Sequence, residues 1–242
     1  MVYSPEDLTK KFSLYRVGKV YWKKETGVKP RTVFLRQVAK NNLGRANEII
    51  SIARDLRKLG LPVPHQGLVD VPGRLSTKYY IATEAFFKGR GRSKIVPFNK
   101  PFFGIFAQPY PTLLRRLSLH KNEAVIKELA SCVVKIVNSG FSIHGLDVFG
   151  LYKKKDGTLG LVIHDLEAIS HPNKAEWPLS AAMGLKKVYL EAATVWSPAR
   201  HLSGLKLKDP RLKLFWGTIM EQLAEPVNKE LDFAWSLSGS AY

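Results

Sequence analysis

The sequence predicts an α+β fold, with an antiparallel sheet that carries one helix followed by a mainly helical half. Residues 15–38 alternate as two strands joined by a turn, and residues 41–59 repeat apolar side chains at helical spacing. Residues 123–139 form a second and more strongly periodic helical pattern. A short hairpin pattern at 148–163 follows that helix and provides the strands of the second half.

The composition fits a globular protein in a reducing compartment. The chain has 242 residues, of which 45% are apolar and 24% charged, enough for one large domain or two lobes. No apolar run approaches the ~20 residues of a spanning helix, and residues 1–6 do not resemble a signal peptide. Cys132 is the single cysteine and excludes an intrachain disulfide, so we expect a buried thiol and a cytoplasmic protein.

The chain is strongly basic. It carries 38 Lys and Arg against 20 Asp and Glu, a net charge of +18. Such a surface attracts polyanions, and the charge alone does not choose among nucleic acid, an anionic membrane face and a phosphorylated glycolipid. Four basic residues in a Gly- and Pro-rich stretch form either an anion-contacting loop or a solvated charge run: Lys88, Arg90, Arg92 and Lys94.

The first half reads as strands around one helix. Tyr15–Lys23 and Thr32–Val38 are strand patterns, and Asn41–Leu59 is a helix with Asn42 as candidate N-cap and Gly60 at its end. Residues 68–71 and 78–83 are two more strands around a turn at Pro72-Gly73.

The second half begins after an irregular, Pro-rich connection. We assign residues 1–86 to the first part, 87–112 to the connection and 113–242 to the helical part. The helix of residues 123–139 ends at Gly140, and further helices are expected around 177–194 and 209–224.

The central segment of the second half is Ile143–Ile169. Val148–Tyr152 and Leu159–Ile163 are short apolar strands, joined by a charged turn with Asp156-Gly157. His144 and Asp147 precede this hairpin.

Asp165 and Glu167 follow the hairpin, so its closure brings two polar clusters to one edge. Carboxylates that face one cleft are costly unless a metal ion or a proton lies between them. The alternative is a β-hairpin with solvated carboxylates at its ends.

This segment resembles the catalytic segment of the protein-kinase-like fold, and most closely the bacterial lipopolysaccharide core kinases that phosphorylate heptose or Kdo. Asp147 and Asp165 lie 18 positions apart, close to the family interval, and Asp165-Leu166-Glu167 fits a variant motif of these kinases. The resemblance covers about residues 15–200. It implies a two-lobed fold that binds ATP and Mg²⁺.

The resemblance also implies roles for three residues of this segment. Asp147, with His144 before it, would orient the acceptor hydroxyl, and Asp165 would hold Mg²⁺ on the nucleotide phosphates. The sequence departs from the family at two points. His144 stands three residues before Asp147 rather than two, and Tyr152 occupies the position of a metal-binding Asn. A shifted register would place Leu146 at the catalytic position and predict an inactive protein.

In the first lobe the resemblance implies a phosphate site. Gly18-x-Val20 would end the glycine-rich loop, Arg36 would replace the phosphate-binding lysine, and Glu48 would pair with Arg36. The alternatives are an exposed basic strand residue and an exposed helical glutamate.

The same resemblance implies that the passage after residues 78–83 contacts the adenine. The Glu84 carbonyl and the Phe86 N–H would face the adenine edge, although any strand that leaves a sheet would look similar.

The first functional hypothesis is therefore an ATP-dependent kinase of a lipopolysaccharide core sugar or a similar small molecule, peripheral at the inner face of the inner membrane. The second is a pseudokinase that binds a polyanion or a protein partner without catalysis, which Tyr152 and Arg36 favour. A nucleic-acid-binding protein is favoured by charge alone, because no recognisable module is present.

Overall fold

The structure is a computed structural model. It describes residues 2–3, 10–12, 15–21, 31–71, 77–84, 96–97, 123–153, 159–163, 165–196 and 209–237. The chain divides into two compact units, residues 1–93 and 94–242. The boundary falls inside the predicted connection at 87–112. Both units combine helices with antiparallel strand pairs, which confirms the predicted α+β class.

The first unit is an antiparallel sheet with one described helix. The strands are β1 (Val2–Tyr3), β2 (Lys10–Phe12), β3 (Tyr15–Tyr21), β4 (Arg31–Val38), β5 (Gln66–Val71) and β6 (Lys78–Glu84). Their order is β1-β3-β4-β6-β5, and β2 also pairs with β3. The predicted strands match β3 to β6 within two residues at each end, and the Pro72-Gly73 turn lies outside the described residues.

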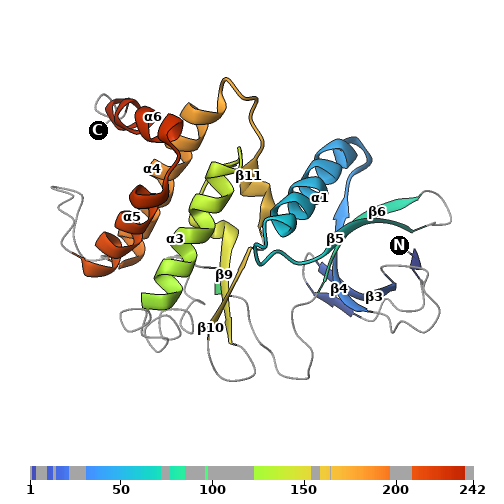
Figure 1. Cartoon of the computed structure of the whole chain (residues 1–242). Coiled ribbons are helices and arrows are strands. Elements are labelled where there is room, and N and C mark those ends of the chain that lie inside the picture. The colour runs from blue at the N-terminus through green and yellow to red at the C-terminus, as the bar shows by residue number, and fades with distance from the viewer. Residues whose placement is uncertain are drawn as a thin grey trace. The chain divides into compact units, whose positions relative to one another are not determined.

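Helix α1 (Leu43–Lys58) connects β4 to β5 and lies beside β5 (Figure 1). Its buried face has the helical spacing that the sequence predicts and consists of Ala46, Ile49, Ile52, Ala53 and Leu56, whereas Leu59 at its end is exposed. The helix ends where predicted, because Gly60 adopts a φ of 75°, a left-handed conformation that costs glycine little. The candidate N-cap Asn42 makes no side-chain capping bond; the short 3₁₀ turn Lys40–Asn42 precedes the helix instead.

The second unit is mainly helical. Its described helices are α3 (Glu123–Asn138), α4 (Trp177–Trp196), α5 (Pro210–Gln222) and α6 (Glu225–Ser236). The first three match the sequence prediction. Gly140, two residues after the end of α3, has a φ of 91°. The sequence prediction does not include helix α6, which begins at Glu225 and has Pro226 in its first turn, where proline is well tolerated.

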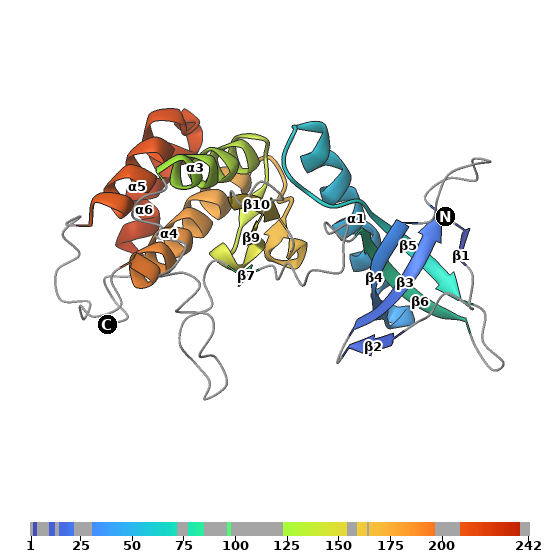
Figure 2. The same ribbon diagram turned by 90° about the horizontal axis from the view of Figure 1, so that it is seen from below.

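The predicted hairpin is present between α3 and α4. Strands β9 (Phe149–Lys153) and β10 (Leu159–Ile163) pair in antiparallel fashion, with Phe149 opposite Ile163. Strand β7 (Val96–Pro97) adds to β9, so part of the connection that we expected to be irregular joins this sheet. Figure 2 shows the hairpin beside α3.

A two-residue strand pair stands next to the hairpin. Strand β8 (Ser142–Ile143) pairs with β11 (Ile169–Ser170), and α3 and α4 both pack on β8. The core of the unit therefore gathers around this pair, with the side chains of Ile143 and Ile169 fully buried. Cys132 on α3 is buried as predicted, and burial raises the pKa of its thiol to about 12.

Asn138 joins the end of α3 to the connection between α5 and α6. Its side-chain amide donates to the Gln222 carbonyl at 2.9 Å, and its side-chain oxygen accepts from the Ala224 N–H at 3.0 Å. These two bonds satisfy backbone groups that the ends of α5 and α6 leave open.

Candidate functional site

The two predicted carboxylates stand at the same end of the β9–β10 hairpin, each in a short 3₁₀ turn. We call Leu146–Val148 with Asp147 the Asp147 turn, and Leu166–Ala168 with the preceding Asp165 the Asp165 turn. The turns are adjacent, and the Asp165 N–H donates to the Val148 carbonyl at 3.5 Å. The hairpin register explains this proximity, because both turns extend from the paired residues Phe149 and Ile163.

The Asp147 turn is held by helix α4. The Leu146 N–H donates to Oε2 of Glu191 at 2.6 Å, a bond to a charged acceptor across 45 positions of sequence. Gly145 lies between the carboxylates of Asp147 and Glu191. A Cβ at that position would lie 2.8 Å from Asp147 Oδ1 and 3.1 Å from Glu191 Oε1. Any side chain at position 145 would therefore displace one or both of these groups.

Helix α4 makes close contacts with β8, the strand that precedes the Asp147 turn. The hydroxyl groups of Ser142 and Ser180 are 2.9 Å apart, and a Cβ on Gly184 would overlap the Ile143 carbonyl oxygen. The helix backbone therefore packs directly on the strand that precedes the Asp147 turn. This packing fixes the turn relative to the core of the unit.

Asp147 carries a buried oxygen without a hydrogen-bond partner among the described residues. This oxygen is Oδ1, in a side chain that is otherwise half-buried. A buried carboxylate oxygen without a donor is costly, so the arrangement favours a bound hydroxyl, proton or cation at this position.

The side chain of Asp165 caps its own turn. Oδ1 of Asp165 accepts from the Glu167 N–H at 3.4 Å, which is long for a hydrogen bond of this kind. Because the bond is weak and the side chain only half-buried, the carboxylate keeps capacity for a further ligand.

His144 precedes the Asp147 turn and lies on the solvent side. Its Nε2 is 2.8 Å from the hydroxyl of Ser170 on β11, and its N–H donates to the Ala168 carbonyl at 2.8 Å. His144 therefore links the entry of the first turn to the exit of the second, rather than adding a group to the carboxylate edge.

Tyr152 does not lie at this edge. It pairs with Gly160 inside the hairpin, three residue pairs from Phe149 and Ile163. Three strand residues span about 10 Å, so the backbone at the position of the expected metal-binding Asn is remote from both carboxylates.

The residues predicted in the first unit are not gathered in the same way. Gly18 lies opposite Val33, whereas Arg36 lies opposite Tyr15 and Ile81. Positions 33 and 36 belong to opposite faces of a strand, so Gly18 and Arg36 do too. The register thus separates the predicted loop end, Gly18 to Val20, from the predicted phosphate-binding cation.

The predicted carboxylate partner of Arg36 has a different neighbour. Glu48 is exposed and pairs with Arg45 at 2.7 Å on the same helix. Glu84 ends β6 opposite Val33, and Phe86 lies outside the described residues. Within the described part of the first unit, the structure therefore shows a sheet with scattered predicted site residues.

Sequence reasoning missed Glu191, which provides the longest-range contact of the site. A signal was present, because Glu191 is the single acidic residue of α4 and follows the apolar run Val188–Leu190. An acid in the buried stretch of a helix requires a partner inside the protein.

Comparisons with known proteins add no assignment. None of the protein-family models matches the chain, and a search of curated proteins finds no significant match. Among the described helices, none combines the length and the apolar character needed to cross a membrane.

Proposed function

We propose that the protein is an ATP-dependent phosphotransferase with a kinase-like arrangement of its second unit. The observation that carries this proposal is the placement of Asp147 and Asp165 in adjacent turns at one end of the β9–β10 hairpin. The order α3, β8, Asp147 turn, hairpin, Asp165 turn agrees with the order of the kinase catalytic segment. The antiparallel sheet with one helix in the first unit also agrees with the kinase small lobe.

In this proposal the two aspartates have different tasks. Asp147, held through Leu146 by Glu191, would accept a hydrogen bond from the acceptor hydroxyl and take its proton as the oxygen attacks the γ-phosphorus. The bond from the γ-phosphorus to the β,γ-bridging oxygen then breaks, and ADP leaves. Positioning of the hydroxyl provides much of the rate, so the anchoring of this turn by α4 is part of the proposal.

The residues at this edge fit a single magnesium ion. Asp165 offers a half-buried carboxylate with one weak internal bond. Among the described residues, no group of three or more His, Cys, Asp or Glu side chains could enclose a metal. Magnesium is often bound by one or two carboxylates together with substrate phosphates and water, so Asp165 with ATP suffices. The ion would neutralise phosphate charge during transfer.

The acceptor that we propose is a sugar hydroxyl of lipopolysaccharide core or a similar glycolipid. The net charge of +18 fits any polyanion, including a phosphorylated glycolipid at the inner face of the inner membrane. The choice of a glycolipid among these polyanions rests on the resemblance of residues 143–169 to the lipopolysaccharide core kinases. Phosphate transfer from labelled ATP to core oligosaccharide, compared with unphosphorylated sugar, tests this choice.

Calorimetry tests the metal and nucleotide assignment. The variant Asp165→Ala should lose Mg²⁺-dependent ATP binding and keep a wild-type circular dichroism spectrum, since the Asp165 side chain makes one weak bond among the described residues. Glu176→Ala is the matched control, because it removes an exposed carboxylate from the same unit. Unchanged Mg·ATP affinity in Asp165→Ala would remove Asp165 from the site.

The second candidate is a kinase-like protein that binds its ligand without catalysis. Three observations favour it: Tyr152 lies inside the hairpin, Asp165 caps its own turn, and Arg36 lies on the other face of the sheet from Gly18. The two candidates differ in one measurement. Nucleotide binding with no phosphate transfer to core sugars or water, in Mg²⁺ or in Mn²⁺, would select the second.

A further inference from the structure

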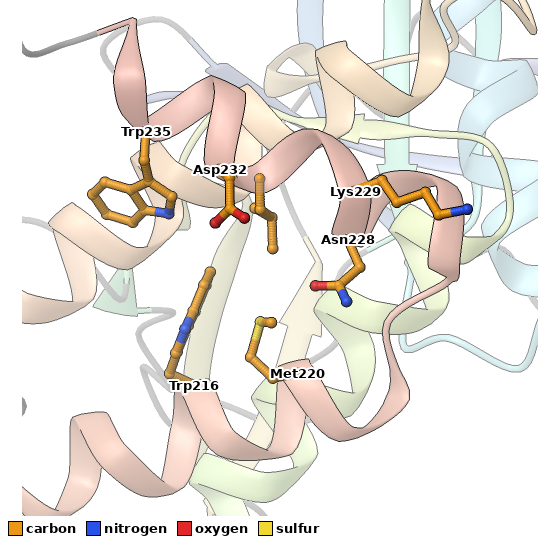
Figure 3. A pocket seen from close by; sticks show the side chains of 7 residues that line it. Trp216, Met220, Asn228, Lys229, Asp232 and Trp235 are labelled. Carbon is orange, nitrogen blue, oxygen red and sulfur yellow. The ribbon is translucent and has the colours of Figure 1, made fainter.

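Helices α5 and α6 line an open pocket that is separate from the two aspartate turns. Its volume is about 410 Å³, within the range of pockets that bind small molecules. Both helices contribute its lining, as Figure 3 shows: Trp216 and Met220 come from α5, and Asn228, Lys229, Leu231, Asp232 and Trp235 from α6.

Two of its walls are indole rings held in fixed positions. Buried Tyr189 of α4 contacts both in edge-to-face geometry, with ring centroids 4.9 Å from Trp216 and 5.5 Å from Trp235. Rings held in this way can bind a ligand with little loss of side-chain freedom.

The chain already places one cation against these rings. Lys186 Nζ lies 5.6 Å from the centroid of the Trp235 ring and donates to the Ala234 carbonyl at 2.8 Å. Lys186 does not line the pocket, so it contacts the Trp235 ring from outside the pocket. The ring of Trp216 remains accessible to a ligand.

Two charged residues line the pocket, an acid and a base, and they differ in their partners. Asp232 is exposed and has no hydrogen-bond or ion-pair partner among the described residues. Lys229 points away from the rings in Figure 3, and its ammonium pairs with Glu225 at 2.7 Å. A protein of net charge +18 therefore presents, in a pocket that two tryptophans also line, a carboxylate that has no partner among the described residues.

We propose that this pocket binds an alkylated ammonium group. Trp216 provides an aromatic face that attracts a cation, Trp235 forms a second apolar wall, and Asp232 provides the opposite charge. The apolar side chains of Met220 and Leu231 suit the methyl groups of such a cation better than a hydrated metal ion. An anion would be repelled by Asp232, and a neutral apolar ligand would remove that carboxylate from water without compensation. This site goes beyond the phosphotransferase proposal, because it shares no residue with the two turns.

Saturation-transfer NMR on the full chain tests the proposal, with tetramethylammonium as the probe and tert-butanol as a neutral compound of similar shape. We expect saturable transfer to tetramethylammonium and much less to tert-butanol. Asp232→Asn should weaken binding about tenfold, since it keeps the shape of the side chain and removes its charge. Glu230→Gln, with the same charge change on the same helix but outside the pocket, should bind as the wild type does.

Three outcomes would overturn the proposal: no transfer to tetramethylammonium, equal transfer to tert-butanol, or equal binding by Asp232→Asn and the wild type. Trp216→Leu provides a second variant, which should weaken binding through loss of the aromatic face. Two further probes separate the sources of the group. Binding of free choline supports a small-molecule ligand, and Asp232-dependent sedimentation with phosphatidylcholine vesicles supports a lipid headgroup.

Discussion

The Asp147 turn and the Asp165 turn look alike in sequence but are held by different means. Each follows or precedes an apolar strand of the same hairpin, and each is a short 3₁₀ turn. The first is fixed by groups from α4, through Glu191 and the contact of Gly184 with Ile143. The second is capped by its own Asp165. One carboxylate is thus positioned by the core of the unit, and the other is left available for a ligand.

The largest effect should come from separating α4 from β8. Gly184→Ala places a methyl group on the Ile143 carbonyl oxygen, which belongs to the backbone and cannot rotate away. We expect a loss of about 3 kcal/mol in the free energy of unfolding, measured by urea denaturation. Gly217→Ala on α5 is the control, because its Cβ would meet no atom within 4 Å. It should be neutral or stabilise by up to about 1 kcal/mol. Equal destabilisation by the two would show that α4 does not pack as described.

A smaller effect is expected when the turn loses its anchor alone. Glu191→Ala leaves the Leu146 N–H without its acceptor and should cost about 1–3 kcal/mol in unfolding free energy. It should also lower phosphate transfer more than it lowers nucleotide affinity, because Asp147 loses its fixed position. Glu176→Ala, an exposed carboxylate just before α4, should change neither property. Wild-type transfer by Glu191→Ala would show that the anchor is dispensable.

The smallest loss of stability is expected where an aspartate caps its own helix or turn. Asp209 accepts a hydrogen bond from the Arg211 N–H at the start of α5, at 2.9 Å, and also pairs with the Arg211 guanidinium. Asp209→Ala should therefore cost about 1 kcal/mol in the free energy of unfolding. Asp165→Ala should cost less, because its bond is longer and lacks a cation. Chemical denaturation of the two variants compares them directly. A larger loss for Asp165→Ala would contradict the weak cap.

Acid should remove the Asp209 contribution. Hydrogen bonds from Arg211 lower the pKa of Asp209 from its ordinary value of 3.8. A lowered folded-state pKa means that the stabilisation is complete above that ordinary value and is lost as the pH falls through the lowered one. The stability difference between the wild type and Asp209→Asn should therefore shrink at low pH. A constant difference would exclude the ionised carboxylate as its cause.

The sequence could predict the elements of the fold but not all the contacts between them. Periodicity located α1 and α3, and a turn with Asp-Gly located the β9–β10 hairpin, because local spacing sets these elements. Helix α6 was not predicted, because a proline such as Pro226 can either begin or interrupt a helix.

The site was predictable to the extent that the hairpin created it. Asp147 and Asp165 meet because strand pairing places the two ends of a hairpin together. Glu191 and the register of Arg36 could not be derived, since the first depends on packing across 45 residues and the second on strand pairing with β3.

The variant Asp147→Asn tests whether Asp147 orients the acceptor hydroxyl, as the proposed function requires. The measurement is transfer of labelled γ-phosphate from Mg·ATP to lipopolysaccharide core sugar, alongside calorimetric nucleotide affinity for both proteins. We predict that nucleotide affinity stays near the wild-type value while the transfer rate falls by about 10²–10⁴, the usual contribution of a positioned base. Transfer by Asp147→Asn at the wild-type rate would contradict the claim.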